Sequence, residues 1–179
     1  WSRVWTSGTG LFNAYGCEGG VDTNSNGKPE VFATGSSDPH WCWETQVFEA
    51  TGDNLFQMVA SLQTNDGYLG FGINAFGDLD GVPPEEFISE GNSHFWIWRP
   101  NLSGGWDLSQ TVEDPLGAGH IQLSCRDVNG NGRTEIFWFG EDEVHMASRT
   151  LVLEADLPLG VPGETSGAPA CLWVRPNPC

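Results

Sequence analysis

The sequence predicts an all-β repeat protein of about three four-stranded units, and three observations carry this prediction. Residues 22–50 recur without a gap as residues 127–155, 105 positions further along the chain. A third, degraded copy of the same loop begins at Asp78, so the loop starts are separated by 56 and 49 residues. A self-match of this length indicates a repeat architecture. Short runs of Val, Ile, Phe and Trp between Gly, Asn, Asp and Pro clusters favour strands over helices throughout.

A period of about 50 residues filled with short strands is typical of a β-propeller blade or a similar β-solenoid unit. We therefore expect blades over residues 1–160, with loops at 22–30, 78–86 and 127–135, and no helix. The expected strands are 11–17, 30–34, 41–50 and 56–62 in the first unit, 68–76, 86–89, 94–99 and 106–112 in the second, and 120–125, 135–139 and 144–148 with 150–154 in the third.

The two ends of the chain bear on how the units assemble. Residues 1–6 match the outermost strand of a unit, whereas the third unit has no obvious fourth strand. Either residues 1–6 complete the third unit by ring closure, or the chain belongs to a larger propeller or assembles with other chains. Propellers have roughly four to eight blades, so we favour the second alternative. Residues 161–179 have the Pro- and Gly-rich composition of a linker.

Charge and composition narrow the possible partners. The net charge of −17 predicts that the surface repels nucleic acid and anionic membranes and attracts divalent cations. The 9 Trp and 10 Phe residues argue for a packed structure rather than disorder. No apolar run approaches the roughly 18–20 residues that span a bilayer, and the chain does not open with a signal peptide, so we expect a mature, processed or excerpted chain.

The cysteines and the overall composition indicate where the protein is located. The five cysteines form no C-x-x-C motif, which disfavours zinc and redox sites. The composition fits an extracellular or cell-surface protein, and Cys171 and Cys179 are spaced so that a disulfide could close a small loop.

The repeated loop has the oxygen spacing of a calcium site. Calcium takes six to eight oxygen ligands, supplied at alternating positions of a tightly wound loop. Side-chain oxygens recur at positions one, three, five and nine, a glycine at position six permits the turn, and position seven offers a backbone carbonyl. The candidate ligands are Asp22, Asn24, Asn26, Lys28 and Glu30 in the first loop and Asp127, Asn129, Asn131, Arg133 and Glu135 in the last.

The alternative is that Asp/Asn/Gly loops are simply good β-turns. Two full copies in phase with the strand pattern favour calcium, at a moderate affinity suited to extracellular levels. The middle loop is a weaker candidate with Asp78, Asp80 and Glu86, because Val82 has no side-chain oxygen and Pro83 replaces the glycine.

The segments Asp22–Val31 and Asp127–Ile136 resemble FG-GAP/VCBS repeats, the blade units of integrin-α-type β-propellers. Residues 47–54 are similar to the strand and turn that follow in many bacterial members. The resemblance covers roughly residues 1–157 and implies a loop that binds calcium and a propeller face or rim that binds partners. Residues 174–178 resemble the opening of the C-terminal sorting or Ig-like domains that often follow such propellers.

Other side chains are weaker functional candidates. His40 and His145 recur in phase, so we expect a structural role at a strand start. We expect Trp41, Trp43, Trp96, Trp98 and Trp138 to pack between blades, with sugar stacking as the alternative, and Trp5 and Trp106 to be more exposed. No nucleophile elbow or Cys/His pair is evident, which disfavours an enzyme.

These observations together predict a secreted, calcium-stabilised propeller module with a structural, adhesive or interaction role. Its partner would be a protein or polysaccharide at the extracellular surface. The alternatives are part of a secreted propeller enzyme, such as a polysaccharide lyase or hydrolase, and a lectin that uses exposed Trp.

Overall fold

The protein is described here by a computed structural model of residues 11–37, 42–63, 74–90, 94–101, 103–113, 120–142 and 147–154. These residues form three antiparallel sheets, ordered β1-β2-β3-β4, β5-β6-β7-β8 and β11-β10-β9. The strands of the first sheet are β1 (Leu11–Val21), β2 (Glu30–Ser37), β3 (Cys42–Gly52) and β4 (Leu55–Gln63). Those of the second are β5 (Asn74–Gly77), β6 (Glu86–Glu90), β7 (His94–Pro100) and β8 (Trp106–Glu113), and those of the third are β9 (His120–Arg126), β10 (Glu135–Asp142) and β11 (Ala147–Leu153). The all-β prediction is confirmed.

Several strands differ in extent from the prediction. β1 continues to Val21, four residues beyond its expected end, because two register shifts let this strand keep pairing with β2. β11 is one continuous strand where two short pieces were expected. Of the expected strand 68–76, the described residues begin at Asn74. Residues 1–6, residues 161–179 and the predicted Cys171–Cys179 disulfide lie outside the described residues.

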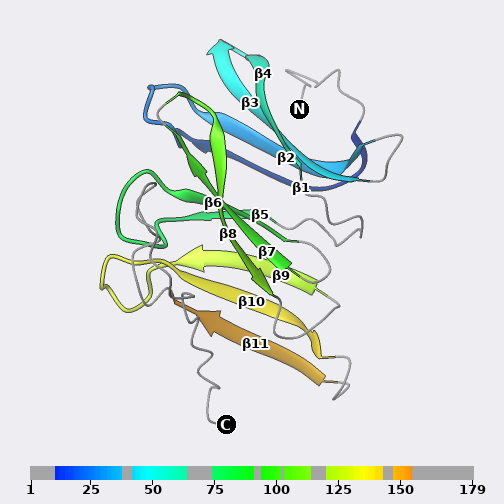
Figure 1. Ribbon diagram of the computed structural model, residues 1–179, viewed down its shortest axis with the longest axis vertical. Helices are drawn as coiled ribbons and strands as arrows, with labels where there is room; N and C mark the ends of the chain where they lie inside the picture. Colours follow the sequence, from blue (N-terminus) through cyan, green and yellow to red (C-terminus); the bar gives the residue numbers. More distant parts are fainter. Residues whose placement is uncertain are drawn as a thin grey trace.

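The three sheets stand in a row, with the middle sheet between the other two (Figure 1). The first strands of the sheets are neighbours, since β1 contacts β5 and β5 contacts β9. The third sheet has three strands in the described part of the chain. No closure of the sheets into a ring is seen among the described residues.

The middle sheet is packed on both faces, which explains its uninterrupted apolar runs. Successive side chains of a strand point to opposite faces. In β7, Trp96 and Trp98 face the first sheet, whereas Phe95 and Ile97 face the third. All five residues of β6 are buried. Burial on two faces removes the polar alternation that a half-exposed strand would show.

Two hydrophobic cores result. The first core, between sheets one and two, consists of Phe32, Val47, Leu62, Phe87, Trp96 and Trp98. The second core, between sheets two and three, consists of Ala75, Leu79, Ile88, Phe95, Ile97, Leu123, Ile136, Trp138 and Leu153. Trp96, Trp98 and Trp138 therefore pack between sheets, as expected. Trp106 is only partly exposed, because its ring packs edge-on against Phe32 with centroids 5.2 Å apart.

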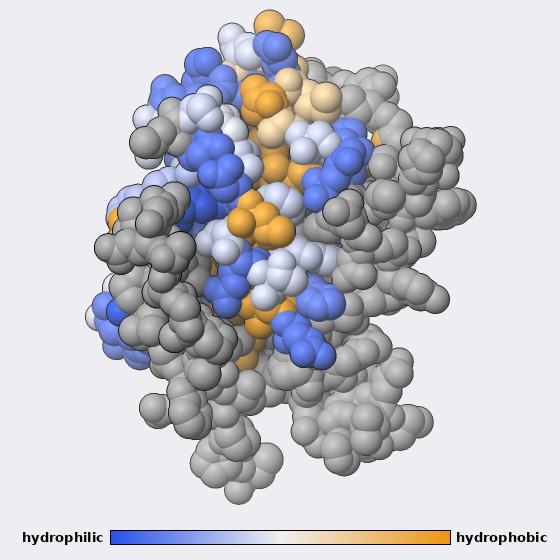
Figure 2. All heavy atoms as spheres, viewed as in Figure 1, coloured by the Kyte–Doolittle hydropathy of each residue, from blue (hydrophilic) through white to orange (hydrophobic). Residues whose placement is uncertain are grey.

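The outer surface is more mixed. Figure 2 shows hydrophobic residues down the middle of the coloured area, separated by hydrophilic ones. The edge strand β4 exposes Leu55, Met58 and Val59. A search of the described residues finds no helix long and apolar enough to cross a membrane.

Sheets two and three approach each other closely at Gly77, and this contact yields a stability prediction. A Cβ atom on Gly77 would lie 2.5 Å from Cγ2 of Thr134 and 3.1 Å from Cβ of Cys125. We expect Gly77→Ala to destabilise the fold by about 1–3 kcal/mol, as overpacking does. Gly52→Ala is the matched control, because its nearest contact would be an ordinary 3.5 Å. Urea unfolding of both variants measures the difference, and equal stabilities would contradict the described packing.

Candidate metal-binding loops

All three repeated loops connect the first two strands of a sheet and share a backbone turn. At position four, each loop has a residue with left-handed φ: Ser25 at 58°, Gly81 at 78° and Gly130 at 76°. At position six, Gly27 and Gly132 also have positive φ, at 85° and 83°. Glycine adopts this conformation without strain, so the predicted role of these two glycines in the turn is confirmed.

In the first loop, the predicted oxygen ligands point into the turn. The two carboxylate oxygens of Asp22 accept the backbone N–H of Asn26 (3.0 Å) and of Gly27 (2.7 Å). Oδ1 of Asn24 also accepts the Asn26 N–H (3.1 Å), and Oδ1 of Asn26 accepts the Lys28 N–H (2.9 Å). Each of these oxygens has a second lone pair, so the turn contacts leave it able to bind a cation.

The last loop repeats most of this arrangement, with one difference: Oδ1 of Asp127 accepts the N–H of Gly130, at position four, at 2.6 Å. Oδ2 of Asp127 accepts the N–H of Gly132 (2.9 Å), as Asp22 does from Gly27. Oδ1 of Asn129 accepts the Asn131 N–H (2.9 Å), and Oδ1 of Asn131 accepts the Arg133 N–H (2.8 Å). The match between residues 22–50 and 127–155 is therefore largely a match of local structure as well as of sequence.

The glutamate at position nine closes all three loops. Glu30, Glu86 and Glu135 are 1%, 0% and 3% exposed, and Oε2 of each accepts the backbone N–H of position two. The donors are Thr23 (2.8 Å), Leu79 (2.9 Å) and Val128 (2.9 Å). In the outer loops, the other carboxylate oxygen, Oε1, accepts the side-chain amide of Asn24 or Asn129. These carboxylates hold the loop ends together and place a buried negative charge beside the loop.

A second glutamate approaches each outer loop from the neighbouring strand. Oε2 of Glu49, on β3, accepts the amide of Asn26 at 2.5 Å, and Oε1 of Glu154 accepts the amide of Asn131 at 2.5 Å. Glu49 also accepts Nζ of Lys28 at 2.8 Å. The Lys28 ammonium, followed by the Asn26 amide, holds the pKa of Glu49 below its ordinary value. A third carboxylate therefore lies beside each outer loop, in addition to the two that the motif contains.

The middle loop has a different arrangement. Asp78, Asp80 and Glu86 each offer a carboxylate oxygen, and these oxygens lie within 4.8 Å of one another. Such a group could hold a metal ion. The guanidinium of Arg99, on β7, lies against it: Nη2 donates to Oδ2 of Asp80, and Nε and Nη2 donate to Oε1 of Glu86 at 2.9 and 2.5 Å.

Pro83 explains a further difference of the middle loop. In the outer loops, the N–H of position six binds the first aspartate. Proline has no N–H, so the middle loop lacks this donor. Oδ1 of Asp78 is accordingly buried without a hydrogen-bond partner in the described structure. The contact between positions five and three is kept, because Val82 donates its N–H to Oδ1 of Asp80 at 2.8 Å.

Burial raises the pKa of the position-nine glutamates of the first and middle loops. Burial raises the pKa of Glu86 to about 7, the Leu79 N–H opposes this shift, and the charge of Asp78 adds to it. Burial also raises the pKa of Glu30. A buried carboxylate is costly to ionise unless a cation is near, so both positions favour binding of a positive charge.

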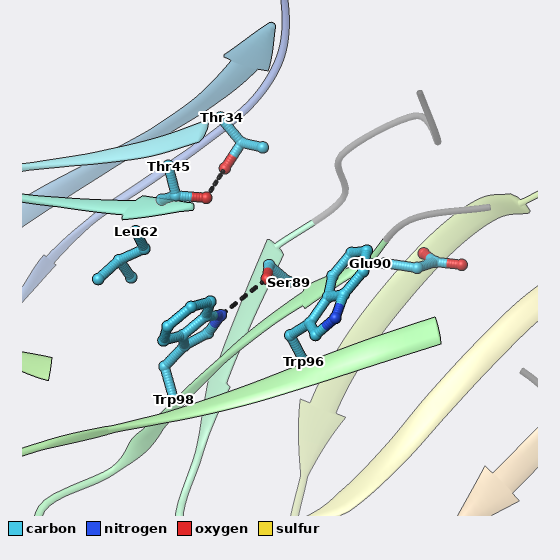
Figure 3. A pocket seen from close by; sticks show the side chains of 7 residues that line it. All are labelled: Thr34, Thr45, Leu62, Ser89, Glu90, Trp96 and Trp98. Carbon is cyan, nitrogen blue, oxygen red and sulfur yellow. Dashed lines mark hydrogen bonds between the residues drawn. The ribbon is translucent and has the colours of Figure 1, made fainter. Parts of the chain in front are cut away.

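Two recesses lie beside these elements. One, of about 350 Å³, lies between the first and middle loops and includes Asp22, Asp78 and Glu85, so its carboxylates favour cations over anions. The other, between sheets one and two, is lined by Thr34, Thr45, Leu62, Ser89, Glu90, Trp96 and Trp98 (Figure 3). Its volume of about 10 Å³ suits a single water molecule and not a sugar ring.

Three residues beside the loops were not predicted as site residues. Glu49 and Glu154 carry a sequence signal, because they recur 105 positions apart within the self-match. Arg99 carries none within its own motif, since it reaches the loop from 13 residues beyond Glu86. Only the pairing of strands shows that Glu49, Glu154 and Arg99 each lie opposite the position-nine glutamate of their own loop.

Comparison with the models of known protein families gives no match for this chain, and no curated protein matches its sequence.

Proposed function

We propose that this chain is a calcium-stabilised, β-propeller-type module of an extracellular protein, with a structural or interaction role. The observation that carries the proposal is the paired geometry of the outer loops. In both, side-chain oxygens at positions one, three and five line one turn, and two further carboxylates flank it from neighbouring strands. Calcium is the cation that prefers such a set of hard oxygen ligands.

The sheet arrangement supports the propeller part of this proposal. Stacked antiparallel sheets whose first strands are neighbours, two of them four-stranded, are features of propeller blades. The resemblance of the loops to FG-GAP/VCBS repeats points in the same direction. We propose that further blades complete the ring, and that a protein or polysaccharide binds its face or rim.

The lectin alternative receives less support. Trp96, Trp98 and Trp138 are 5%, 7% and 0% exposed, so these rings are not available for sugar stacking. No described side-chain constellation favours the enzyme alternative over the structural one.

Thermal unfolding with and without calcium tests the proposal. We expect EDTA to lower the Tm and calcium to restore it, because a ligand bound only to the folded state stabilises by about 2.7 kcal/mol per site at 100 times its Kd. Asp22→Ala and Asp127→Ala should each remove part of the calcium response. Asp53→Ala, in the exposed β3–β4 turn, removes the same charge outside the loops and should leave the response unchanged.

An unchanged Tm on adding calcium to the EDTA-treated wild-type chain would refute the calcium assignment. A calcium response that persists in the Asp22→Ala/Asp127→Ala double variant would place the bound ion elsewhere.

A further inference from the structure

The position opposite the ninth loop residue differs in charge among the three sheets. In the first sheet, Glu30 pairs with Glu49. In the third, Ile136 pairs with Leu153, so one further step of the same register sets Glu135 opposite Glu154. In the middle sheet, Phe87 pairs with Trp98, and the same step sets Glu86 opposite Arg99.

The side chain at this position turns toward its loop in each sheet. Glu49 and Glu154 contact the asparagine at position five of their loops. Arg99 contacts the position-three and position-nine carboxylates, Asp80 and Glu86. In the first loop, the Lys28 ammonium binds Glu49, the carboxylate added from β3. In the middle loop, the Arg99 guanidinium binds the position-three and position-nine carboxylates of the loop motif itself.

Burial makes the cation at the middle loop necessary. The Asp80 and Glu86 side chains are 1% and 0% exposed, and that of Arg99 is 16% exposed. Isolated buried carboxylates are strongly unfavourable, whereas hydrogen-bonded ion pairs are tolerated. A guanidinium with two nitrogens engaged supplies both charge and directed donors.

The middle loop lacks two features of the outer loops, whether or not Arg99 is present. Position five is Val82, which offers no side-chain oxygen, and position six is Pro83, which cannot adopt the positive φ of Gly27 and Gly132. Of the three grouped carboxylates that remain as potential ligands, Arg99 pairs with those of Asp80 and Glu86.

We propose that Arg99 is the resident cation of the middle loop, and that removing it opens a divalent-metal site on Asp78, Asp80 and Glu86. The comparison with calcium in the outer loops rests on the proposed function, whereas the contacts of Arg99 do not. The middle sheet is then held together without metal, and the two outer loops are the metal-responsive ones.

The number of calcium ions bound per chain, measured by equilibrium dialysis, tests this inference. We expect Arg99→Glu, which restores the carboxylate found at Glu49 and Glu154, to bind one calcium ion more than the wild-type chain. Arg99→Lys keeps the positive charge and should keep the wild-type number. Arg149→Gln, which removes a positive charge from β11, is the control and should also keep that number.

The test separates this inference from the calcium assignment of the outer loops. If the outer loops bind no calcium, the wild-type chain binds no calcium ion, yet the Arg99→Glu variant should still bind one. A folded Arg99→Glu variant with an unchanged number would overturn the inference. Should that variant not fold, the Asp22→Ala/Asp127→Ala double variant, which retains Arg99, decides the question. If the double variant binds no calcium, the inference is supported. If the double variant binds calcium and loses it when Asp80→Asn is added, the inference is overturned.

Discussion

Replacing Phe32 with alanine is expected to lower the free energy of unfolding by about 3–5 kcal/mol, the range for deleting a fully buried aromatic ring. Phe32 lies on β2 with no exposed surface, at the centre of the first core. Its ring stacks on Phe87 with centroids 4.6 Å apart and meets Phe76 edge-on at 4.7 Å. The substitution would leave a cavity where four aromatic rings from two sheets, that of Trp106 included, now meet.

Urea unfolding followed by circular dichroism measures this loss. Phe139→Ala is the control, because Phe139 lies on β10 and is 37% exposed, so its loss should cost far less. A loss below about 1 kcal/mol for Phe32→Ala would mean that the first and second sheets do not pack as described.

The second large effect is expected at Trp138, where Trp138→Ala should also cost about 3–5 kcal/mol. This side chain has no exposed surface and packs edge-on against Phe95, with centroids 6.0 Å apart. Its Nε1–H donates to Oε1 of Glu90 at 2.9 Å, across the boundary between sheets two and three. The loss therefore combines a cavity with a broken buried hydrogen bond.

Trp138→Phe separates these two contributions. It keeps an aromatic ring in the core and removes the donor to Glu90, which is 2% exposed. Removing one partner of a buried hydrogen bond costs about 1–3 kcal/mol. The same unfolding measurement should place Trp138→Phe between the wild-type chain and Trp138→Ala, whereas wild-type stability for Trp138→Phe would contradict a structural role for the Glu90 contact.

The local parts of this structure were predictable from the sequence. The turn glycines, the Asp and Asn oxygens directed into the loops and the short strands around them depend on residues within about ten positions of one another. Gly27 and Gly132 are required by positive φ, and the position-nine glutamate follows directly from the spacing. These features recur in the sequence because the same local geometry recurs in the fold.

The features that were missed depend on how strands pair. Glu49 reaches Asn26 across 23 residues, and Glu90 reaches Trp138 across 48. The first contact is set by hairpin length and strand register, and a shift of one residue would turn the side chain to the opposite face. The second depends on how sheets two and three pack against each other. The extension of β1 to Val21 has the same origin, since its register shifts are not encoded in any alternation of polar and apolar residues.

Arg99 illustrates this limit most clearly. The sequence of the middle loop, with Val82 and Pro83, indicates a weakened calcium motif. It does not indicate what balances the charge of Asp80 and Glu86. That answer lies on β7, and it appears only when β6 and β7 are paired.

The central claim, calcium in both outer loops, is tested most directly by a crystal structure grown in calcium, with the anomalous signal of the ion recorded. We expect one anomalous peak in each outer loop, about 2.3–2.6 Å from carboxylate oxygens of Asp22 and Asp127 respectively. We expect none beside Arg99. Absence of both outer peaks at saturating calcium would contradict the account.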